Sequence, residues 1–405
     1  MRVLHTADWH LSDRLGRMDR REDIIARLKE IAGYLDEYEV DVLVVAGDLF
    51  SQPSRMGDMR EAVGDVKDVF KPFLARGGTM VAVSGNHDNE ALFGLLRSAL
   101  DLAHPLEPQD DTPLPGGRLY LAARPTLLLL KDPAGQRVQF LLMPYPTPPR
   151  YLRGESASYS SLEEKNRAMH QALLRELHRI QERYVDPKLP TVLVSHVHVR
   201  GSQVHNRYHI SELDDIVFEP GEVPTHWAYV AYGHIHKPQA LSGADHVRYA
   251  GSIERSDHGE RKDKKSVTLV EIGATGRVCK PIVLPLDATP VYRVEIDDPD
   301  EQVPRLREQY PDHKRALVSY RLLYDPTKHD KNEISREIEN TFPRWYERRV
   351  MPTGAELALD GVGAELSARD VPGTVRDYLR ERLPEHGGDR GLVLRLADEL
   401  LAEVG

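Results

Sequence analysis

The chain has 405 residues, more than one typical domain, so we expect two or three structural units. A hydrophobic content of 40% is enough for sizeable cores and argues against disorder. The net charge of −10 excludes a generic polycation and counts mildly against nucleic-acid binding, for which a local basic face would still be sufficient.

The single cysteine, Cys279, excludes an internal disulfide and fits a reducing compartment. No apolar run approaches the roughly 20 residues that span a bilayer. We see no signal peptide, because the first candidate metal ligand already occurs at position 8. We therefore expect a cytoplasmic protein.

The first predicted strand, Arg2–Ala7, is followed by Asp8 and His10. Side chains two positions apart on extended backbone point the same way, so this pair can present a carboxylate and an imidazole to one ion. Apolar residues at helical spacing predict a helix over Ile24–Leu35, which forms a βαβ unit with the next strand.

That next strand, Val42–Ala46, is a run of five apolar residues, typical of a parallel strand buried on both faces. Gly47 and Asp48 follow it, at the strand end where ligands bind in open α/β sheets. Taken alone, Asp48 is most simply a turn residue. An apolar strand followed by Asp, Asn or His occurs five times in the chain, and this repetition favours a metal ligand.

A helix is predicted over Met59–Ala75 and a third strand over Met80–Val83, which leads to three polar residues. Of these, Asn86 can supply a carbonyl oxygen to a metal and His87 can donate a proton. We expect Asp88 to orient the His87 ring. A solvated Asx turn is the alternative.

The middle of the chain predicts a surface loop over 104–117, a strand pair over Leu119–Leu130 and Arg137–Met143, and a helix over Leu162–Tyr184. A fourth buried strand, Thr191–Val194, leads to His196, our strand-end candidate at this point.

His198 is two positions after His196, so its side chain can point the same way, but it is not one of the five positions at which Asp, Asn or His follows an apolar strand. We therefore favour a role other than metal ligation. The fifth strand, Trp227–Tyr232, leads to His234 and His236, which are spaced to face one metal cluster.

Five basic residues are candidates for DNA contacts: Arg55, Arg200, Arg207, Arg255 and Lys262. The segment Arg200–His209 fits a substrate-facing loop and an ordinary solvated loop equally well. The stretch His258–Lys265 could touch phosphates, but a solvated hairpin tip between the strands Val247–Ser252 and Ser266–Ile272 is the simpler interpretation.

The strand-end candidates form a set of nitrogen and oxygen donors without a thiolate: Asp8, His10, Asp48, Asn86, His196, His234 and His236. Seven donors exceed what one ion needs and suit two ions that share one carboxylate, for which Asp48 is the natural bridge. Mixed imidazole, carboxylate and amide ligation favours Mn, Fe or Zn over Mg or Ca. Two such ions can clamp a phosphate and activate a water, and His87 is placed to protonate the leaving alkoxide.

In order and spacing, these motifs resemble those of the calcineurin-like metallophosphoesterases: Asp8-x-His10, Gly47-Asp48, Gly85-Asn86-His87-Asp88, His196 and Gly233-His-x-His236. Longer strings are similar to those of the SbcD nucleases, the bacterial branch of the double-strand-break repair nucleases: His5-Thr-Ala-Asp-Trp-His-Leu, Gly47-Asp-Leu-Phe with Pro53-Ser54, and Tyr249-x-Gly-Ser-x-x-Arg255 followed by Gly259-Glu260. The resemblance covers residues 1 to about 272.

The resemblance implies a nuclease with two Mn²⁺ ions that acts as a 3′→5′ exonuclease on duplex DNA and as an endonuclease on single strands and hairpins. It also implies a homodimer with an SMC-like ATPase partner of the SbcC type, and hence an association with the nucleoid. The acidic net charge conflicts with DNA binding unless the partner supplies much of the basic surface.

We therefore predict an α/β fold: a metallophosphoesterase sandwich of two mixed β-sheets flanked by helices over residues 1–280, and a small α/β capping, DNA-contacting domain over 285–350. A linker over 351–370 and a helical tail over 371–405 follow. In the capping domain we expect strands at Val291–Ile296 and Ala316–Leu323 and helices at Val303–Gln309 and Glu333–Thr341. Only its position, and no motif, resembles the family here.

The tail predicts two helices, at about 371–383 and 390–404. The second carries one continuous apolar face: Val393, Leu396, Ala397, Leu400, Leu401 and Val404. It can pack on the chain's own core, or dock on the base of the partner's coiled coil, which we favour because the tail follows a long linker.

Two other functions remain open. A small-molecule phosphodiesterase or phosphoprotein phosphatase could use the same ligands, although the capping domain and tail argue against it. A non-catalytic DNA-end tether would not need the intact His87 or the complete ligand set.

Overall fold

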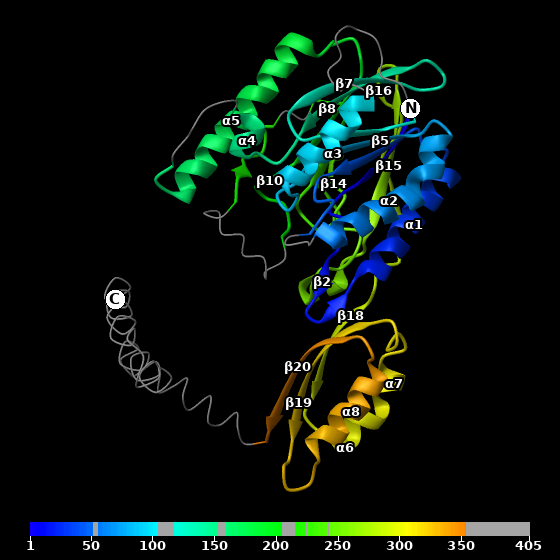
Figure 1. Cartoon of the computed structure of the whole chain (residues 1–405), viewed down its shortest axis with the longest axis vertical. Helices are drawn as coiled ribbons and strands as arrows, with labels where there is room; N and C mark the ends of the chain where they lie inside the picture. The colour runs from blue at the N-terminus through cyan, green and yellow to red at the C-terminus, as the bar shows by residue number, and fades with distance from the viewer. Residues whose placement is uncertain are drawn as a thin grey trace. The chain divides into compact units, whose positions relative to one another are not determined.

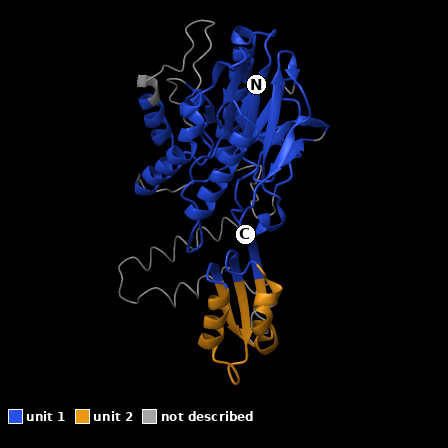
Figure 2. Cartoon of the chain, turned by 90° about the vertical axis from the view of Figure 1, so that its right-hand side faces the viewer, with its two compact units in different colours: residues 1–293, 312–319, 342–347 blue, residues 294–311, 320–341, 348–405 orange. Residues whose placement is uncertain are grey.

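The computed structural model describes residues 1–51, 56–103, 117–152, 159–204, 215–223, 226–241 and 243–353. The chain divides into two compact units, coloured in Figure 2. Unit 1 comprises residues 1–293, 312–319 and 342–347, and unit 2 comprises 294–311, 320–341 and 348–405. Most of the predicted linker and the whole predicted tail lie outside the described residues.

The first sheet of unit 1 has the strand order β16-β15-β1-β4-β5-β6, and β17 also pairs with β15. Its strands are β1 (Arg2–Thr6), β4 (Val42–Ala46), β5 (Thr79–Val83), β6 (Leu119–Ala122), β15 (Ser266–Gly273), β16 (Gly276–Arg277) and β17 (Ile282–Pro285). The four strands β1, β4, β5 and β6 run parallel, so their carboxyl ends meet at one edge.

The second sheet has the order β13-β14-β12-β9-β8-β7. Its strands are β7 (Thr126–Lys131), β8 (Arg137–Met143), β9 (Thr191–His196), β12 (Tyr229–Gly233), β13 (Gln239–Leu241) and β14 (Ala244–Tyr249). Here β8, β9, β12 and β14 are parallel. Two short pairs are separate from both sheets: β2 (Arg14–Leu15) with β3 (Met18–Asp19), and β10 (His198–Val199) with β11 (Val217–Phe218).

Helices cover the outer face of each sheet (Figure 1). The helices of unit 1 are α1 (Arg21–Glu37), α2 (Met56–Ala75), α3 (Glu90–Ala103), α4 (Pro148–Tyr151), α5 (Leu162–Tyr184) and the 3₁₀ helix η1 (His258–Lys262). Apolar residues of α1, α2 and α3 share one core with the first sheet, and residues of α5 share another with the second sheet. A third core lies between the sheets, which gives the helix–sheet–sheet–helix layering of a sandwich.

Strand β4 shows why its sequence is continuously apolar. Val42, Val44 and Ala46 belong to the core between the sheets, whereas Leu43 and Val45 belong to the core under the helices. Alternate side chains therefore enter two different cores, as the prediction of a strand buried on both faces requires. The predicted α/β sandwich of two mixed sheets is confirmed.

One predicted strand pair is confirmed in its pairing, because Thr126–Lys131 pairs with Arg137–Met143, but the bounds of its first strand are wrong. The segment predicted as one strand over Leu119–Leu130 forms two strands, because β6 pairs with β5 in the first sheet and β7 pairs with β8 in the second. Arg124 and Pro125 lie between them, and proline has no N–H for a sheet ladder, so the chain leaves one sheet there and enters the other.

The chain after the sandwich forms a three-stranded sheet in the order β18-β19-β20. Its elements are β18 (Val291–Ile296), α6 (Pro299–Gln302), the 3₁₀ helix η2 (Val303–Arg305), α7 (Leu306–Gln309), β19 (Leu317–Tyr324), α8 (Lys331–Thr341) and β20 (Trp345–Pro352). The sequence did not predict β20, whose central residues Glu347, Arg348 and Arg349 are charged and exposed, as is common in an edge strand. Within the described ranges, no helix is both long enough and apolar enough to cross a membrane.

Candidate metal centre

The seven predicted ligands follow strand ends in both sheets and meet in one place. The first sheet supplies Asp8 and His10 after β1, Asp48 after β4 and Asn86 after β5, and the second supplies His196 at the end of β9 and His234 and His236 after β12. In the second sheet the register pairs Gly233 with His196, so β9 and β12 end side by side.

Four of these ligands have left-handed backbone, with φ of 50° at Asp8, 46° at His10, 52° at Asp48 and 92° at His234. Such a conformation costs a non-glycine residue about 1–3 kcal/mol and persists only where the surroundings impose it. Hydrogen bonds impose it here: the Asp8 amide donates to the Gly47 carbonyl (3.0 Å), and the His10 amide donates to the Asp48 carbonyl (3.1 Å).

Two glycines of the motifs allow the close approach of ligands. A Cβ at Gly47, where φ is +92°, would overlap the His196 ring. A Cβ at Gly85 would overlap the Asp48 carboxylate. Glycine at both positions therefore leaves the space that these two ligands occupy.

The first ligand cluster consists of Asp8, His10, His236 and Asp48. The Nε2 atoms of His10 and His236 lie 3.0 Å apart, and one oxygen of Asp8 lies within 4.8 Å of both rings' ligand atoms. The Oδ2 atom of Asp48 lies 4.0 Å from His10 Nε2.

The second cluster consists of Asp48, Asn86, His196 and His234. The Asn86 Oδ1 atom lies 2.9 Å from His196 Nε2 and 3.0 Å from His234 Nδ1. The Oδ2 atom of Asp48, which belongs to the first cluster, lies 3.2 Å from His196 Nε2. Asp48 is therefore shared between the two clusters.

The donor chemistry of the second cluster fits a cation. His196 donates through Nδ1 to the Ala46 carbonyl (2.7 Å), so the lone pair of its neutral ring is on Nε2. That nitrogen faces oxygens of Asn86 and Asp48, which are also acceptors. Positive charge between these atoms, from a metal ion or a ring proton, satisfies them together.

The pKa values of His196 and His236 show the same demand for positive charge, whereas that of His10 does not. Burial opposes a charge on His196, but Asp48 outweighs it and raises the pKa of His196 to about 9. Burial likewise opposes a charge on His236, yet Glu260 raises the pKa of His236 to about 8. Burial lowers the pKa of His10 to about 3, with a further contribution from His236.

Two carboxylates outside the ligand set hold ligand histidines. Glu260 lies 2.8 Å from His236 Nδ1, which leaves Nε2 of that ring for the first cluster. Asp215 lies 2.8 Å from His234 Nε2, which leaves Nδ1 for the second. The predicted motif strings included Glu260, but the sequence analysis missed Asp215.

Arg150 was also missed. It is 5% exposed, and Nη1 donates to the carbonyls of Gly85 (2.8 Å) and Tyr145 (3.0 Å), while Nη2 donates to that of Asp88 (3.3 Å). It therefore holds the loop that carries Asn86. The one sequence signal at this position is that Arg150 directly follows a proline-rich stretch.

His87 lies beside the clusters without being needed as a ligand. Its backbone amide donates to Asp48 Oδ1 (2.9 Å), and its ring centroid is 5.2 Å from that of His10. Burial lowers the pKa of His87 against the opposing effect of Asp48.

The structure corrects the role expected for Asp88. Its two carboxylate oxygens accept the backbone amides of Phe50 (2.9 Å) and Gly85 (2.7 Å). Asp88 therefore ties the loop after β5 to the loop after β4, and it does not orient the His87 ring.

The residues predicted to contact DNA differ in where the structure places them. Arg55 and Arg207 lie outside the described residues. Arg200 is exposed and donates to Glu219 (2.6 Å), and Lys262 is exposed on η1. These two stay predictions.

Arg255 is a correction. Its guanidinium is partly buried and donates to the carbonyls of Ala288 (2.8 Å), Thr289 (2.9 Å) and Asp263 (2.9 Å), so its role is to hold the backbone of the sandwich.

The solvated hairpin tip predicted over His258–Lys265 is also wrong. Glu260 and Lys265 are each 1% exposed and form an ion pair of 2.6 Å. The stretch is therefore partly buried, and its buried carboxylate contacts His236.

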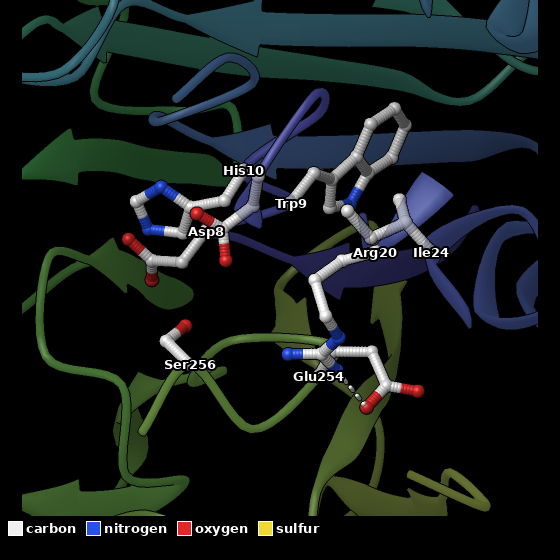
Figure 3. Close-up of a pocket in the computed structure, with 8 residues that line it drawn as sticks. Asp8, Trp9, His10, Arg20, Ile24, Glu254 and Ser256 are labelled. Carbon is white, nitrogen blue, oxygen red and sulfur yellow. Dashed lines mark hydrogen bonds and ion pairs between the residues drawn. The ribbon is translucent and has the colours of Figure 1, made fainter. Parts of the chain in front are cut away.

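A small cavity beside Asp8 and His10 has about the volume of one water molecule, 10 Å³ (Figure 3). Arg20 lines its far side, is 1% exposed, and donates to Glu254 (3.1 Å) and Asp23 (2.8 Å). The side of the cavity that Arg20 lines is therefore formed by a structural ion-pair network, and the cavity is not a substrate cleft.

Comparison with known proteins agrees with this site. Residues 1–238 match the model of the calcineurin-like phosphoesterase family. The SbcD subunit of the nuclease SbcCD from Bacillus subtilis is 24% identical over 86% of this chain and 93% of its own length. The SbcD subunits from Rhodobacter capsulatus and Escherichia coli K12 are 30% and 26% identical over 70% and 67% of this chain, and over 69% and 64% of their own lengths.

The family match covers more than half of the chain and includes all seven predicted ligands. The Rhodobacter relative reaches 30% identity over more than two thirds of both chains. The chain therefore belongs to the calcineurin-like phosphoesterase family and, within it, to the SbcD nuclease group.

Proposed function

We propose that this protein is a di-metal DNA nuclease that hydrolyses phosphodiester bonds with two divalent ions, Mn²⁺ being the expected metal. The observation that carries the proposal is the position of Asp48, whose Oδ2 atom reaches His196 of one cluster (3.2 Å) and His10 of the other (4.0 Å). A carboxylate shared by two ligand sets is the arrangement that a two-ion site needs. The names of the relatives support DNA as the substrate.

We assign the residues to two ligand sets that share Asp48. Asp8, His10, His236 and Asp48 would hold one ion, and Asp48, Asn86, His196 and His234 would hold the other. Two bound divalent ions supply positive charge for the phosphodiester oxygens and lower the pKa of water.

We assign the role of general acid to His87, which in its protonated form would donate a proton to the leaving alkoxide. Asp88 and Arg150 position the loop that carries it.

We further propose the finer activities that the motif resemblance implies: 3′→5′ exonuclease action on duplex DNA and endonuclease action on single strands and hairpins. The same resemblance supports an SMC-like ATPase partner of the SbcC type, a homodimer, DNA contacts from the capping domain, and a place at the cytoplasmic nucleoid. The relatives are each named as one subunit of SbcCD, which supports a partner subunit.

The decisive experiment compares substrates on the purified full chain. We expect cleavage of an end-labelled duplex and of a hairpin with Mn²⁺, and no cleavage after chelation. Faster hydrolysis of a nitrophenyl phosphodiester or a phosphopeptide than of DNA would favour the small-molecule or phosphatase function. DNA binding without cleavage under all metal conditions would favour the tether.

A further inference from the structure

A buried carboxylate, Asp215, joins a ligand histidine to a histidine outside the ligand set. Its Oδ2 atom lies 2.8 Å from His234 Nε2 and 3.1 Å from His198 Nδ1. Its Oδ1 atom accepts the Tyr145 hydroxyl (3.2 Å) and the Ile216 amide (2.8 Å). Asp215 is only 4% exposed, and four donors satisfy its two oxygens.

A short strand pair brings this carboxylate to the site. In the parallel pair β10–β11, His198 is opposite Val217, so Asp215 lies just before β11 and close to His198. Ile216 and Phe218 are buried in the core between the second sheet and α5. Apolar packing on both sides of Val217 therefore fixes the segment that carries Asp215.

The hydrogen bond from His234 to Asp215 decides which ring nitrogen can bind a metal. A neutral imidazole that donates through Nε2 carries its lone pair on Nδ1. His234 Nδ1 lies 3.0 Å from Asn86 Oδ1. Without an acceptor at Nε2, the ring proton can move to Nδ1, and Nδ1 can then donate a hydrogen bond to Asn86 Oδ1. That hydrogen bond would occupy both atoms, so neither could bind a metal.

The two outer carboxylates differ in charge balance. Glu260, which holds His236, forms an ion pair of 2.6 Å with Lys265. In the part of the chain that the structure describes, the ion pairs of Asp215 are with His198 and His234 alone. Among these pairs, Asp215 is thus shared between two imidazole rings, whereas Glu260 is shared between an imidazole ring and a lysine.

We propose that Asp215 is a positioning residue for the ion held by Asn86, His196 and His234, and that His198 holds Asp215 in place. The inference rests on the di-metal function proposed above. The competing interpretation is a third ion bound by His198, Asp215 and His234, whose ligand atoms lie within 4.8 Å of one another. We favour positioning, because the two ring nitrogens converge on one oxygen as hydrogen-bond donors do, and the Tyr145 hydroxyl and Ile216 amide already occupy the other oxygen.

The test uses two variants of the full chain, each of which lacks a ligand of one cluster, so that only the other cluster can bind an ion. Asp215→Ala is then added to each variant. His236→Ala leaves only the second cluster complete, and His196→Ala leaves only the first. Mn²⁺ titration of the metal-free proteins, followed by the electron paramagnetic resonance signal of free Mn²⁺, gives the affinity of the remaining site. We expect Asp215→Ala to weaken binding about 10–100-fold in the His236→Ala background and to leave the His196→Ala background unchanged.

Two further variants make the result specific. Glu260→Gln should show the mirror pattern, with weaker binding only in the His196→Ala background. Glu219→Gln, an exposed carboxylate close to Asp215 in the chain, should change neither background. Unchanged binding by Asp215→Ala in the His196→Ala background also shows that the variant folds.

The outcomes separate this inference from the proposed function. If the wild-type chain binds fewer than two ions, the di-metal proposal fails. If it binds two and Asp215→Ala affects both backgrounds equally or neither, the positioning role is overturned. A third ion that is lost in Asp215→Ala would overturn it in favour of a separate metal site.

Discussion

Asp48 lies where the two ligand clusters meet, so its removal should affect both ions. Asp48→Asn keeps the shape of the side chain but loses the charge and one acceptor oxygen that the clusters share. We expect the metal content of the purified protein, measured by elemental analysis, to fall at both positions. Asp68→Asn, on the exposed surface of α2, should keep both ions. Full retention of one ion by Asp48→Asn would rule out the bridge.

His87 is expected to matter for rate and little for structure. If it protonates the leaving alkoxide, His87→Gln should slow DNA cleavage by roughly 10²–10⁴-fold. Metal content and DNA affinity should be nearly unchanged, because only the backbone amide of His87 contacts the shared ligand Asp48. His178→Gln, on the exposed side of α5, should cleave like the wild type. Near wild-type cleavage by His87→Gln would show that another group is the acid.

The sequence could predict that the seven candidate ligands lie together, because each lies at or within four residues of the end of an apolar strand. Asp215 and Arg150 have no such local signal. Asp215 reaches His234 through the pairing of β10 with β11, and Arg150 reaches Gly85 across 65 positions of the chain. Both act through contacts that periodicity and spacing along one chain do not encode.

Elements were predicted best where one pattern runs without interruption. The helix over Leu162–Tyr184 has its predicted bounds, with Ser161 accepting the Glu164 amide as its N-cap. Strand β20 was missed because its exposed edge carries charges, which hide the strand pattern. The join at Pro125 was missed because an apolar run on both sides of it suggested one strand.

The first turn of α1 offers a pH-dependent contribution to the stability of unit 1. Asp23 accepts Arg344 Nη2 (2.6 Å) and Arg20 Nε (2.8 Å), and all three residues belong to that unit. Burial opposes ionisation, but the hydrogen bonds from the two arginines outweigh it and hold the pKa of Asp23 below its usual range. The folded-state pKa is thus below the unfolded value of about 3.9, so the stabilisation is complete above that value and is lost as pH falls through the folded pKa.

We therefore expect Asp23→Asn to lower the free energy of unfolding of unit 1 by about 1–3 kcal/mol at pH 7. The difference from the wild type should narrow below about pH 4. Urea unfolding followed by tryptophan fluorescence measures it, because Trp9, Trp227 and Trp345 all belong to unit 1. Asp68→Asn is again the control, and a difference that stays constant down to pH 3 would contradict the linkage.

For the whole molecule, the main conflict is between an acidic chain and a DNA substrate. The net charge is −10, and of the five basic residues predicted to contact DNA, Arg255 is engaged with backbone carbonyls. A protein that binds the DNA backbone needs a local excess of Lys and Arg. A basic partner subunit would supply it, which makes the docking of that partner the central question for function.

The predicted tail, outside the described residues, is our candidate for that docking. Leu396 and Leu400 lie on its apolar face, and each would contribute roughly 1.5–3 kcal/mol when buried. Leu396→Glu with Leu400→Glu should therefore weaken binding of an SbcC-type ATPase by about 10²–10⁴-fold or more, measured by calorimetry or co-purification. Intrinsic nuclease activity should be unchanged. Arg395→Glu adds the same negative charge on the opposite face and should still bind. Normal binding by the double variant would show that these leucines do not dock the partner. Loss of nuclease activity through unfolding of unit 1 would show that they pack on the chain's own core instead.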